Sequence, residues 1–275
     1  MTLALVIALA LLQGVTEFLP VSSSGHLRLL EAWFGIETEQ TLLDIVLHVG
    51  TLVPVVIVYR AELGRMARAS AAALREPRRL LADADARLVL LVGAATVPTG
   101  VVAVLFGDVM ERLALDIRAV AACLALTGCI LLGMGVLERR AAASDRPLRT
   151  LADLTLRDAL IIGTLQGIAI LRGVSRSGTT ITAGLLVGLD RRSAAAFSFL
   201  MAIPAILGAL VLALRHGAPP GQGLSIFLVG GLVAAASGTL ALRWLLRLLQ
   251  KGQLHHFAWY CFALSASAFA WTFFR

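Results

Sequence analysis

The chain has 275 residues, of which 59% are apolar and 15% are charged. Average soluble domains are about 45–50% apolar and about 25% charged, so the composition argues against a water-soluble domain, and it excludes a disordered chain because disorder requires low hydrophobicity. The net charge is +7, but the basic residues flank apolar runs without interleaved aromatic residues, so we expect them to contact anionic lipid headgroups and no nucleic acid. The cysteines Cys123, Cys129 and Cys261 have no metal-ligand or redox spacing and predict neither a zinc site nor a disulfide scaffold.

The first predicted element in chain order is a short apolar run, Thr2–Leu12, which stops at the polar stretch that begins with Gln13. A second short run, Ala159–Leu171, stops at Arg172. Because a spanning helix needs about 20 apolar residues, these two runs are typical of re-entrant helical hairpins. The stretch Arg60–Arg87 predicts an amphipathic helix on the membrane surface. Six segments are long enough to span the membrane: Thr41–Tyr59, Leu88–Gly107, Ala119–Leu137, Ser193–Leu214, Leu224–Leu242 and Phe257–Phe274.

The sequence therefore predicts an all-α integral membrane protein, a single membrane domain over residues 1–275 with six full transmembrane helices and two re-entrant hairpins. If Arg60–Arg87 is cytoplasmic and each long segment crosses once, 17 basic residues lie in cytoplasmic loops and five lie outside. This asymmetry agrees with the positive-inside rule and places both termini outside. Two further basic residues, Arg172 and Arg176, fall at membrane depth.

The two short segments are similar to each other. Leu12–His26 and Leu165–Thr179 are identical at seven of fifteen positions, at an offset of 153 residues. In this topology the first hairpin enters from outside, the second enters from inside, and three spans follow each. This arrangement predicts an inverted-topology duplication, with repeat one at 1–140 and repeat two at 155–275. Broken helices in such a pair meet near the membrane midplane and form the binding site.

Each hairpin tip carries a Ser-x-Ser-Gly motif. Small hydroxyl residues beside glycine let backbone amides approach an anion closely, and a helix that starts there adds positive potential. Arg176 lies between the two serines of the second tip, where its guanidinium can bind two phosphate oxygens. One such motif alone is typical of a polar turn, but the pair predicts a phosphate or diphosphate ligand. The motif residues are Ser22, Ser24, Gly25, Ser175, Ser177 and Gly178.

Four ionisable residues in or near the first hairpin are candidates for chemistry or for its support. Glu17 is its only carboxylate, and a carboxylate at membrane depth is costly, so it is a candidate general base, metal ligand or partner of Arg176; the alternative is a purely structural ion pair. His26 is a candidate to activate a serine or protonate a leaving oxygen, and the alternative is a packing role. Asp44 and His48 share a helix face and are either supporting groups of the cavity or a structural pair.

The sequence resembles a known family. Gln13-x-x-x-Glu17 followed by Phe18–His26 is similar to the first signature of bacterial undecaprenyl-diphosphate phosphatases of the bacitracin-resistance type. Gly173–Thr180 resembles most of the second signature, and Phe197–Pro204 is also similar to a family segment. The resemblance implies an integral membrane hydrolase of the bacterial inner membrane. It would convert undecaprenyl diphosphate to the monophosphate carrier lipid of peptidoglycan synthesis at the outer face.

The resemblance also implies roles for individual residues. Glu17 would be the key carboxylate, Ser23 the nucleophile, His26 its acid–base partner, and Arg176 a phosphate-binding catalytic residue. The implied cofactor is a divalent cation, magnesium or calcium, with Glu17 as the candidate ligand. The implied partners are a polyprenyl diphosphate lipid and the bilayer, and a homodimer is a further expectation. The expected substrate-binding residues are Gln13, Ser22, Ser24, Gly25, Ser175, Ser177, Gly178 and Thr180.

Two positions depart from the family pattern. Arg172 stands where the family usually has proline, and it either adds a phosphate contact or marks a paralogue with another ligand. Gln13 leaves a single carboxylate in the first signature, so a cation would rely on substrate oxygens. The nucleophile is open as well, since a water activated by Glu17 or His26 fits the same residues as Ser23.

Two other classes of function compete with the hydrolase. Inverted repeats with broken helices are also transporter architecture, so the main alternative is a transporter or flippase for a phosphorylated polyprenyl lipid. Glu17, Ser23 and His26 together favour chemistry, because passive binding of an anion needs none of them. A channel or a structural membrane protein would leave the duplicated polar tips unexplained.

Overall fold

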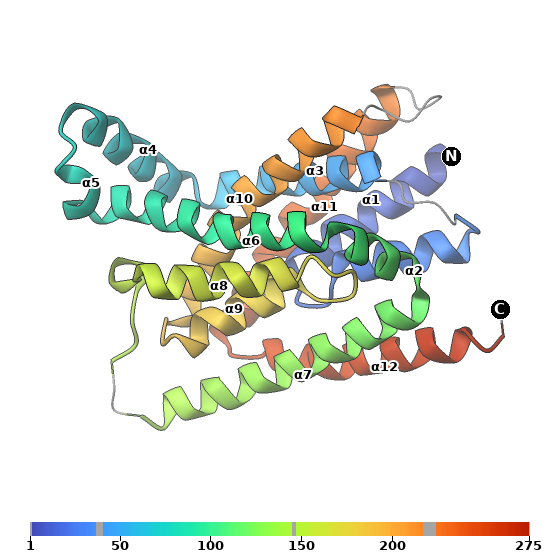
Figure 1. Ribbon diagram of the computed structural model, residues 1–275. Helices are drawn as coiled ribbons and strands as arrows, with labels where there is room; N and C mark the ends of the chain where they lie inside the picture. Colours follow the sequence, from blue (N-terminus) through green and yellow to red (C-terminus); the bar gives the residue numbers. More distant parts are fainter. Residues whose placement is uncertain (1, 37–40, 145–146, 217–223, 275) are drawn as a thin grey trace.

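The computed structural model describes residues 2–36, 41–144, 147–216 and 224–274 (Figure 1). Within these ranges the chain is α-helical and contains no β-strand, apart from one isolated bridge between Arg149 and Leu189. The all-α prediction is confirmed. The helices are α1 Leu3–Phe18, α2 Ser23–Trp33, α3 Thr41–Val58, α4 Arg60–Arg75, α5 Arg79–Ala82, α6 Ala84–Leu115, α7 Ile117–Ala142, α8 Leu156–Ile168, α9 Arg176–Leu186, α10 Arg191–His216, α11 Leu224–Gln250 and α12 Phe257–Trp271.

Four helices of the described ranges, α6, α7, α10 and α11, are long and apolar enough to cross a membrane. The bent pair α3 and α4 adds a fifth candidate span. The predicted last span is shorter than expected, because α12 has 15 residues and ends at Trp271. The predicted span Leu88–Gly107 lies inside the longer α6 of 32 residues, which begins at the N-cap Asp83. The arrangement of six spans and two re-entrant hairpins stays a prediction.

The chain turns sharply where the basic segment begins. The axes of α3 and α4 differ by 83° at a break next to Tyr59. The predicted surface segment Arg60–Arg87 is helical for most of its length, as α4, α5 and the start of α6. Leu74 on α4 is 87% exposed, as expected for a helix that presents apolar side chains to a membrane surface.

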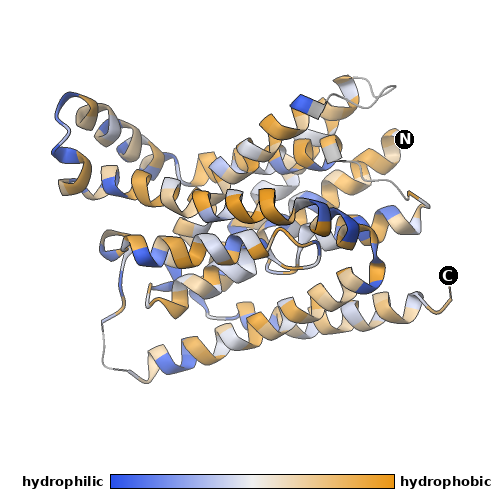
Figure 2. Cartoon of the chain, in the orientation of Figure 1, coloured by the Kyte–Doolittle hydropathy of each residue, from blue (hydrophilic) through white to orange (hydrophobic). Residues whose placement is uncertain are grey.

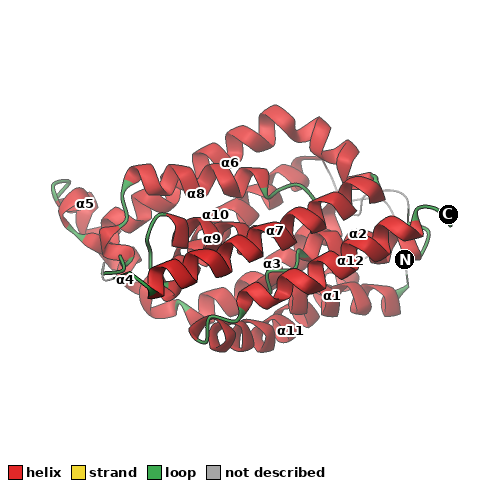
Figure 3. Cartoon of the chain, turned by 90° about the horizontal axis from the view of Figure 1, so that it is seen from below, coloured by secondary structure: helices red, strands yellow, loops and turns green. Residues whose placement is uncertain are grey.

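Both short apolar runs form helix–loop–helix units, α1–α2 and α8–α9. In the packing of the helices, α1 lies on α11, α8 lies on α6, and α7 runs along α12 (Figures 1 and 3). Glycines permit the first two contacts: a Cβ at Gly14 would lie 2.6 Å from the Ala234 carbonyl oxygen, and one at Gly163 would collide with the Ala95 carbonyl. Each hairpin therefore packs on a long helix from the other half of the chain, and the loops between the hairpin helices come to the centre.

The distribution of polarity is that of a membrane protein. Large apolar side chains such as Val104 (80% exposed) and Leu240 (71%) face outward, while Gln13 and Thr180 are fully buried. Figure 2 shows apolar residues along most of the helices. A lipid exterior removes the cost of exposing apolar surface, and the buried polar residues mark where function is expected.

Candidate active site

The two hairpin tips have the same local architecture. Ser22 is the N-cap of α2, and its side chain accepts a hydrogen bond from the Gly25 amide at 3.2 Å. Ser175 is the N-cap of α9 and accepts from the Gly178 amide at 3.1 Å. The first serine of each Ser-x-Ser-Gly motif thus caps a helix, and the other residues of the motif form its first turn. Two positively polarised helix ends result.

The two tips lie against each other. A Cβ at Gly25 would approach the Gly173 Cα to 2.9 Å, and a Cβ at Gly178 would approach the Pro20 Cβ to 3.2 Å. The Ser177 hydroxyl also donates to the Leu19 carbonyl at 3.4 Å. The glycine of each motif is therefore the point at which the other loop passes, and the two motifs, 153 positions apart in the sequence, form one site.

The tips differ in backbone strain. Gly173 in the second tip has a φ of 102°, which glycine adopts without penalty. The equivalent residue of the first tip is Pro20, whose ring fixes φ near −65°. The left-handed turn instead falls on Ser22, at a φ of 67°, the one non-glycine residue with positive φ in the described ranges. Such strain persists where the surroundings impose it, and it is frequent at functional sites.

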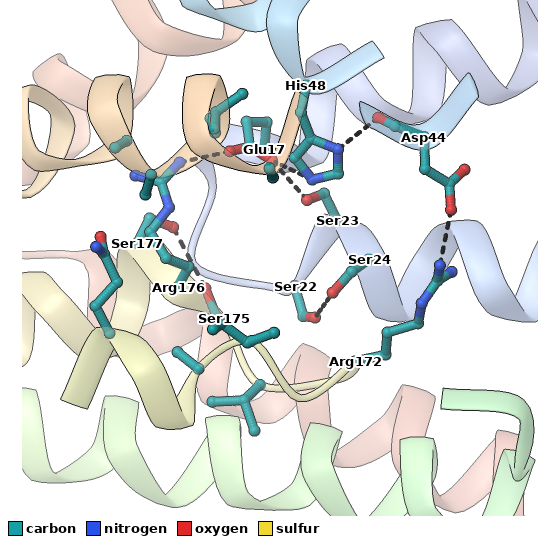
Figure 4. Close-up of a pocket in the computed structure, with 18 of the residues that line it drawn as sticks. Glu17, Ser22, Ser23, Ser24, Asp44, His48, Arg172, Ser175, Arg176 and Ser177 are labelled. Atoms are coloured by element: carbon teal, nitrogen blue, oxygen red, sulfur yellow. Dashed lines mark hydrogen bonds and ion pairs between the residues drawn. The ribbon is translucent and has the colours of Figure 1, made fainter. Parts of the chain in front are cut away.

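A cavity of about 270 Å³ opens beside the tips (Figure 4). Its polar wall comes from the two tips and from α1, α3, α6 and α8. It consists of Glu17, Ser22, Ser23, Ser24, Asp44, His48, Thr99, Gln166, Arg172, Ser175, Arg176 and Ser177. Its apolar wall is provided mainly by α10, with Ala202, Ala205, Ile206 and Ala209, and α3 adds Ile45. The cavity can therefore hold an amphiphilic ligand with an anionic head and an apolar tail.

Glu17 is at the centre of the polar wall. Arg176 Nη2 donates to its Oε1 at 2.5 Å, and its Oε2 accepts hydrogen bonds from the Ser23 hydroxyl at 2.7 Å and from Gln13 Nε2 at 2.8 Å. His48 Nε2 lies 3.5 Å from the same Oε2 (Figure 4). Because the guanidinium, the hydroxyl and the amide all act as donors, the carboxylate is present in its charged form.

Residues 6–267 match the model of the family described as bacitracin resistance protein BacA. The chain belongs to this family. Among its relatives, three proteins named undecaprenyl-diphosphatase are each 40% identical to it. The one from Desulfatibacillum aliphaticivorans aligns over 274 residues, 95% of this chain and 96% of the relative. The one from Carboxydothermus hydrogenoformans aligns over 264 residues, 94% of this chain and 93% of the relative. The one from Methanobrevibacter smithii aligns over 271 residues, 96% of this chain and 95% of the relative. With its apolar helices, this BacA-family chain is a multi-pass membrane protein.

Of the predicted catalytic residues of this BacA-family chain, His26 lies apart from the others. Its Nδ1 donates to the Ser22 carbonyl at 2.7 Å, and its Nε2 lies 2.7 Å from the hydroxyl of Tyr260 on α12. A carbonyl only accepts, so the neutral ring carries its proton on Nδ1 and accepts the Tyr260 proton at Nε2. His26 does not line the cavity that Glu17 and Ser23 share. Its acid–base role stays a prediction.

The remaining predicted binding residues divide into two groups. The serines of both motifs line the cavity. Gln13 and Thr180 support its wall from behind: Gln13 holds Glu17, and the Thr180 hydroxyl lies 2.8 Å from the Arg176 carbonyl and 2.5 Å from the Ser198 hydroxyl. Gly25 and Gly178 act through their small size, at the crossing of the tips.

Arg172, where the sequence departs from the family signature, lies in the cavity wall. Its Nη2 donates to Asp44 Oδ2 at 2.9 Å (Figure 4). Its Nη1 lies 3.7 Å from Glu31 Oε2. The side chain therefore links the second tip to α2 and α3, and its headgroup lies close enough to the cavity to meet a ligand. Both interpretations of Arg172, a phosphate contact and a different ligand, remain predictions.

Sequence reasoning placed Asp44 and His48 on one face of a helix but did not connect His48 with Glu17. The usable signal was the presence of two ionisable residues inside an otherwise apolar span, which marks a functional candidate. The contact itself is tertiary, between α1 and α3.

Proposed function

We propose that this protein is a membrane hydrolase that removes the terminal phosphate of undecaprenyl diphosphate and releases undecaprenyl phosphate. The observation that carries the proposal is the position of Glu17. Its carboxylate is bonded at once to the Ser23 hydroxyl and to Arg176, in the wall of a cavity flanked by two helix N-termini. This constellation, in a chain of the BacA family whose relatives are named undecaprenyl-diphosphatase, supports phosphoryl transfer to an oxygen nucleophile.

The diphosphate binds where positive potential converges. The first residues of α2 and α9 line the cavity, and helix N-termini attract phosphate groups. Arg176 adds a guanidinium that can bind two oxygens at once.

The apolar wall on α10, with Ala202, Ala205 and Ala209, fits the first isoprene units of the lipid. The polar and apolar walls thus match the two parts of the substrate.

In the reaction, Glu17 takes the proton of the attacking hydroxyl. The nucleophile is Ser23, whose hydroxyl already donates to Glu17, or a water in the same place. Its oxygen forms a bond to the terminal phosphorus, and the bond from that phosphorus to the bridging oxygen breaks. Undecaprenyl phosphate leaves with the electron pair. With Ser23 as nucleophile, a water then hydrolyses the phosphoserine. The water oxygen bonds to phosphorus, the bond from phosphorus to the Ser23 oxygen breaks, and that oxygen takes the proton held by Glu17. Glu17 accepts one proton of the water, and the other stays on the departing phosphate.

Arg176 stabilises the charge that spreads over the terminal phosphate oxygens in the transition state, as guanidinium groups do in phosphoryl transfer. The alternative function, transport of a phosphorylated lipid, requires no carboxylate bonded to a hydroxyl, and the family comparisons favour the hydrolase.

The divalent cation implied by the resemblance stays a prediction, and the protein side chains alone do not fit such a site. No group of three His, Cys, Asp or Glu side chains converges on a point within the described ranges. Magnesium and calcium take six or more oxygen ligands, and the oxygens of Glu17 already accept hydrogen bonds from Arg176, Ser23 and Gln13. No step of the proposed reaction depends on a metal.

We further propose that the protein resides in the bacterial inner membrane with the active site open to the outer face. The excess of basic residues on the side of α4 supports this orientation. The homodimer stays a prediction.

The test is phosphate release from undecaprenyl diphosphate by the purified protein in detergent, with magnesium and with a chelator. We expect release by the wild type and a loss of about 100-fold or more in Glu17→Gln, which keeps the size of the side chain but removes its basicity. Lipid-diphosphate affinity should survive in that variant. A folded wild type that binds the lipid and releases no phosphate would refute the hydrolase and favour the transporter.

A further inference from the structure

His48 contacts Glu17, and the proposed reaction leaves it unused. It lies on α3, a helix that belongs to neither hairpin, and it lines the cavity. Its side chain is 24% exposed, while that of Glu17 is 5% exposed. Figure 4 shows the ring pointing from α3 toward the Glu17 carboxylate. A histidine there has to satisfy both of its ring nitrogens.

The hydrogen bonds of the ring determine its protonation. Nδ1 lies 2.7 Å from the carbonyl oxygen of Asp44, which can only accept, so Nδ1 carries a proton. Nε2 lies 3.5 Å from Oε2 of the charged Glu17. A proton on Nε2 makes the ring a partner of this carboxylate on the side away from Asp44, since Nδ1 already faces the Asp44 carbonyl.

Arg176 cannot serve Glu17 and the substrate equally. In the structure its Nη2 is 2.5 Å from Glu17 Oε1. A bound diphosphate competes for the same guanidinium with a higher charge and more acceptor oxygens. When Arg176 turns to the phosphates, Glu17 loses its strongest partner on that side. The donors that still hold its carboxylate are then Gln13, Ser23 and His48.

We propose that His48 is a positioning residue that keeps the Glu17 carboxylate aimed at the nucleophile once Arg176 engages the diphosphate. The proposal rests on the proposed hydrolase function. It requires α3 to hold the ring in place, and α3 is anchored one turn earlier by the ion pair of Asp44 with Arg172. His48 acts through Glu17 and makes no bond to the phosphates, so its loss impairs turnover and spares binding.

The experiment compares His48→Leu, which removes both donors, with His48→Gln, whose amide keeps one donor. His256→Leu is the matched control, because His256 is exposed at the start of α12. We expect kcat of His48→Leu to fall about 10- to 100-fold, the usual cost of losing a group that orients a reacting residue. KM should stay within about twofold, and His48→Gln should recover most of kcat. If His48→Leu fails to fold, His48→Ala replaces it.

A double variant separates positioning from general structural support. In a Glu17→Gln background, His48→Leu should cause no further loss of turnover, because the carboxylate it positions is gone. Equal losses in both backgrounds, a rise in KM without a fall in kcat, or full turnover of His48→Leu would each overturn the proposal. Phosphate release by the wild type in the same assay is the reference. Its absence would instead refute the hydrolase itself.

Discussion

At the scale of single residues, the charge of Glu17 is held by donors from three parts of the chain. Gln13 comes from its own helix, Ser23 from the start of the next helix, and Arg176 from the second half. A buried carboxylate without such partners would be strongly destabilising. The same bonds prepare the group for chemistry, because they leave Oε2 pointing at a hydroxyl.

The strain at Ser22 makes the two capping serines respond differently to glycine. Ser22→Gly removes a cap, which lowers stability by a few tenths of a kcal/mol. It also relieves the strain of a left-handed backbone at a non-glycine residue, which costs about 1 kcal/mol or more. Ser175 has an ordinary φ of −74°, so Ser175→Gly gains nothing. We expect the Tm of the purified protein to rise or hold in the first variant and to fall in the second. Equal falls would show that the Ser22 turn is unstrained.

Arg172 neutralises Asp44 and Glu31 in a buried cluster. Arg172→Pro restores the family signature but leaves two buried carboxylates with less counter-charge. Breaking a buried ion pair from one side costs about 3–5 kcal/mol, so we expect a clear loss of thermal stability. Asp44→Asn added to Arg172→Pro should recover part of it, since it removes the charge with which Arg172 pairs at 2.9 Å. An unchanged Tm in Arg172→Pro would place the arginine outside the network.

How far the sequence predicts this site depends on the range of the interactions. The caps at Ser22 and Ser175 follow from a local motif, and the meeting of the two tips follows from the repeat and the hydropathy. The contact of His48 with Glu17 and the pairing of His26 with Tyr260 depend on how α3 and α12 rotate against the hairpins. That rotation is decided by side-chain packing over the whole molecule, which no local pattern encodes.

At the scale of the elements, the hairpins are fixed by close helix packing. Where α1 crosses α11 and α8 crosses α6, the glycines Gly14 and Gly163 remove the side chain that would hold the backbones apart. In a membrane, such contacts replace the hydrophobic effect as the source of helix association. Hydropathy located the hairpin helices, but their partner helices emerged only from the fold.

Two glycine-to-alanine variants test this packing with opposite signs. Gly163→Ala places a methyl group on the Ala95 backbone, and overpacking of this kind costs about 1–3 kcal/mol. A Cβ at Gly93 on α6 would meet no atom within 4 Å. The free energy of unfolding of Gly93→Ala should therefore rise by roughly 0.5–1 kcal/mol, because alanine restricts the unfolded chain. Thermal unfolding of both variants measures the difference. Stabilisation by Gly163→Ala would mean that α8 stands further from α6.

At the scale of the whole molecule, charge determines orientation. The basic residues gather on the side where α4 lies, and few lie at the junction of α6 and α7. The positive-inside rule predicts that this junction lies outside. Orientation also decides from which side of the membrane the diphosphate reaches Glu17.

Cysteine labelling tests the orientation. In a variant lacking Cys123, Cys129 and Cys261, we place single cysteines at Glu111, near the end of α6, and at Ser144, beyond the end of α7. An impermeant thiol reagent applied to intact cells should modify the first and spare the second, and permeabilised cells should show both. Labelling at Ser144 alone would invert the topology and move the site opening to the cytoplasmic side.

The bond between Glu17 and Arg176 spans 159 positions of the chain. The two partners are therefore synthesised at different times. A ribosome adding about 5–20 residues per second inserts the carboxylate on the order of 10 s before the guanidinium emerges. During that interval the first hairpin carries a charge whose later counterion does not yet exist. The nascent first half must therefore stabilise Glu17 through Gln13, Ser23 and His48. All three are synthesised before α6 begins.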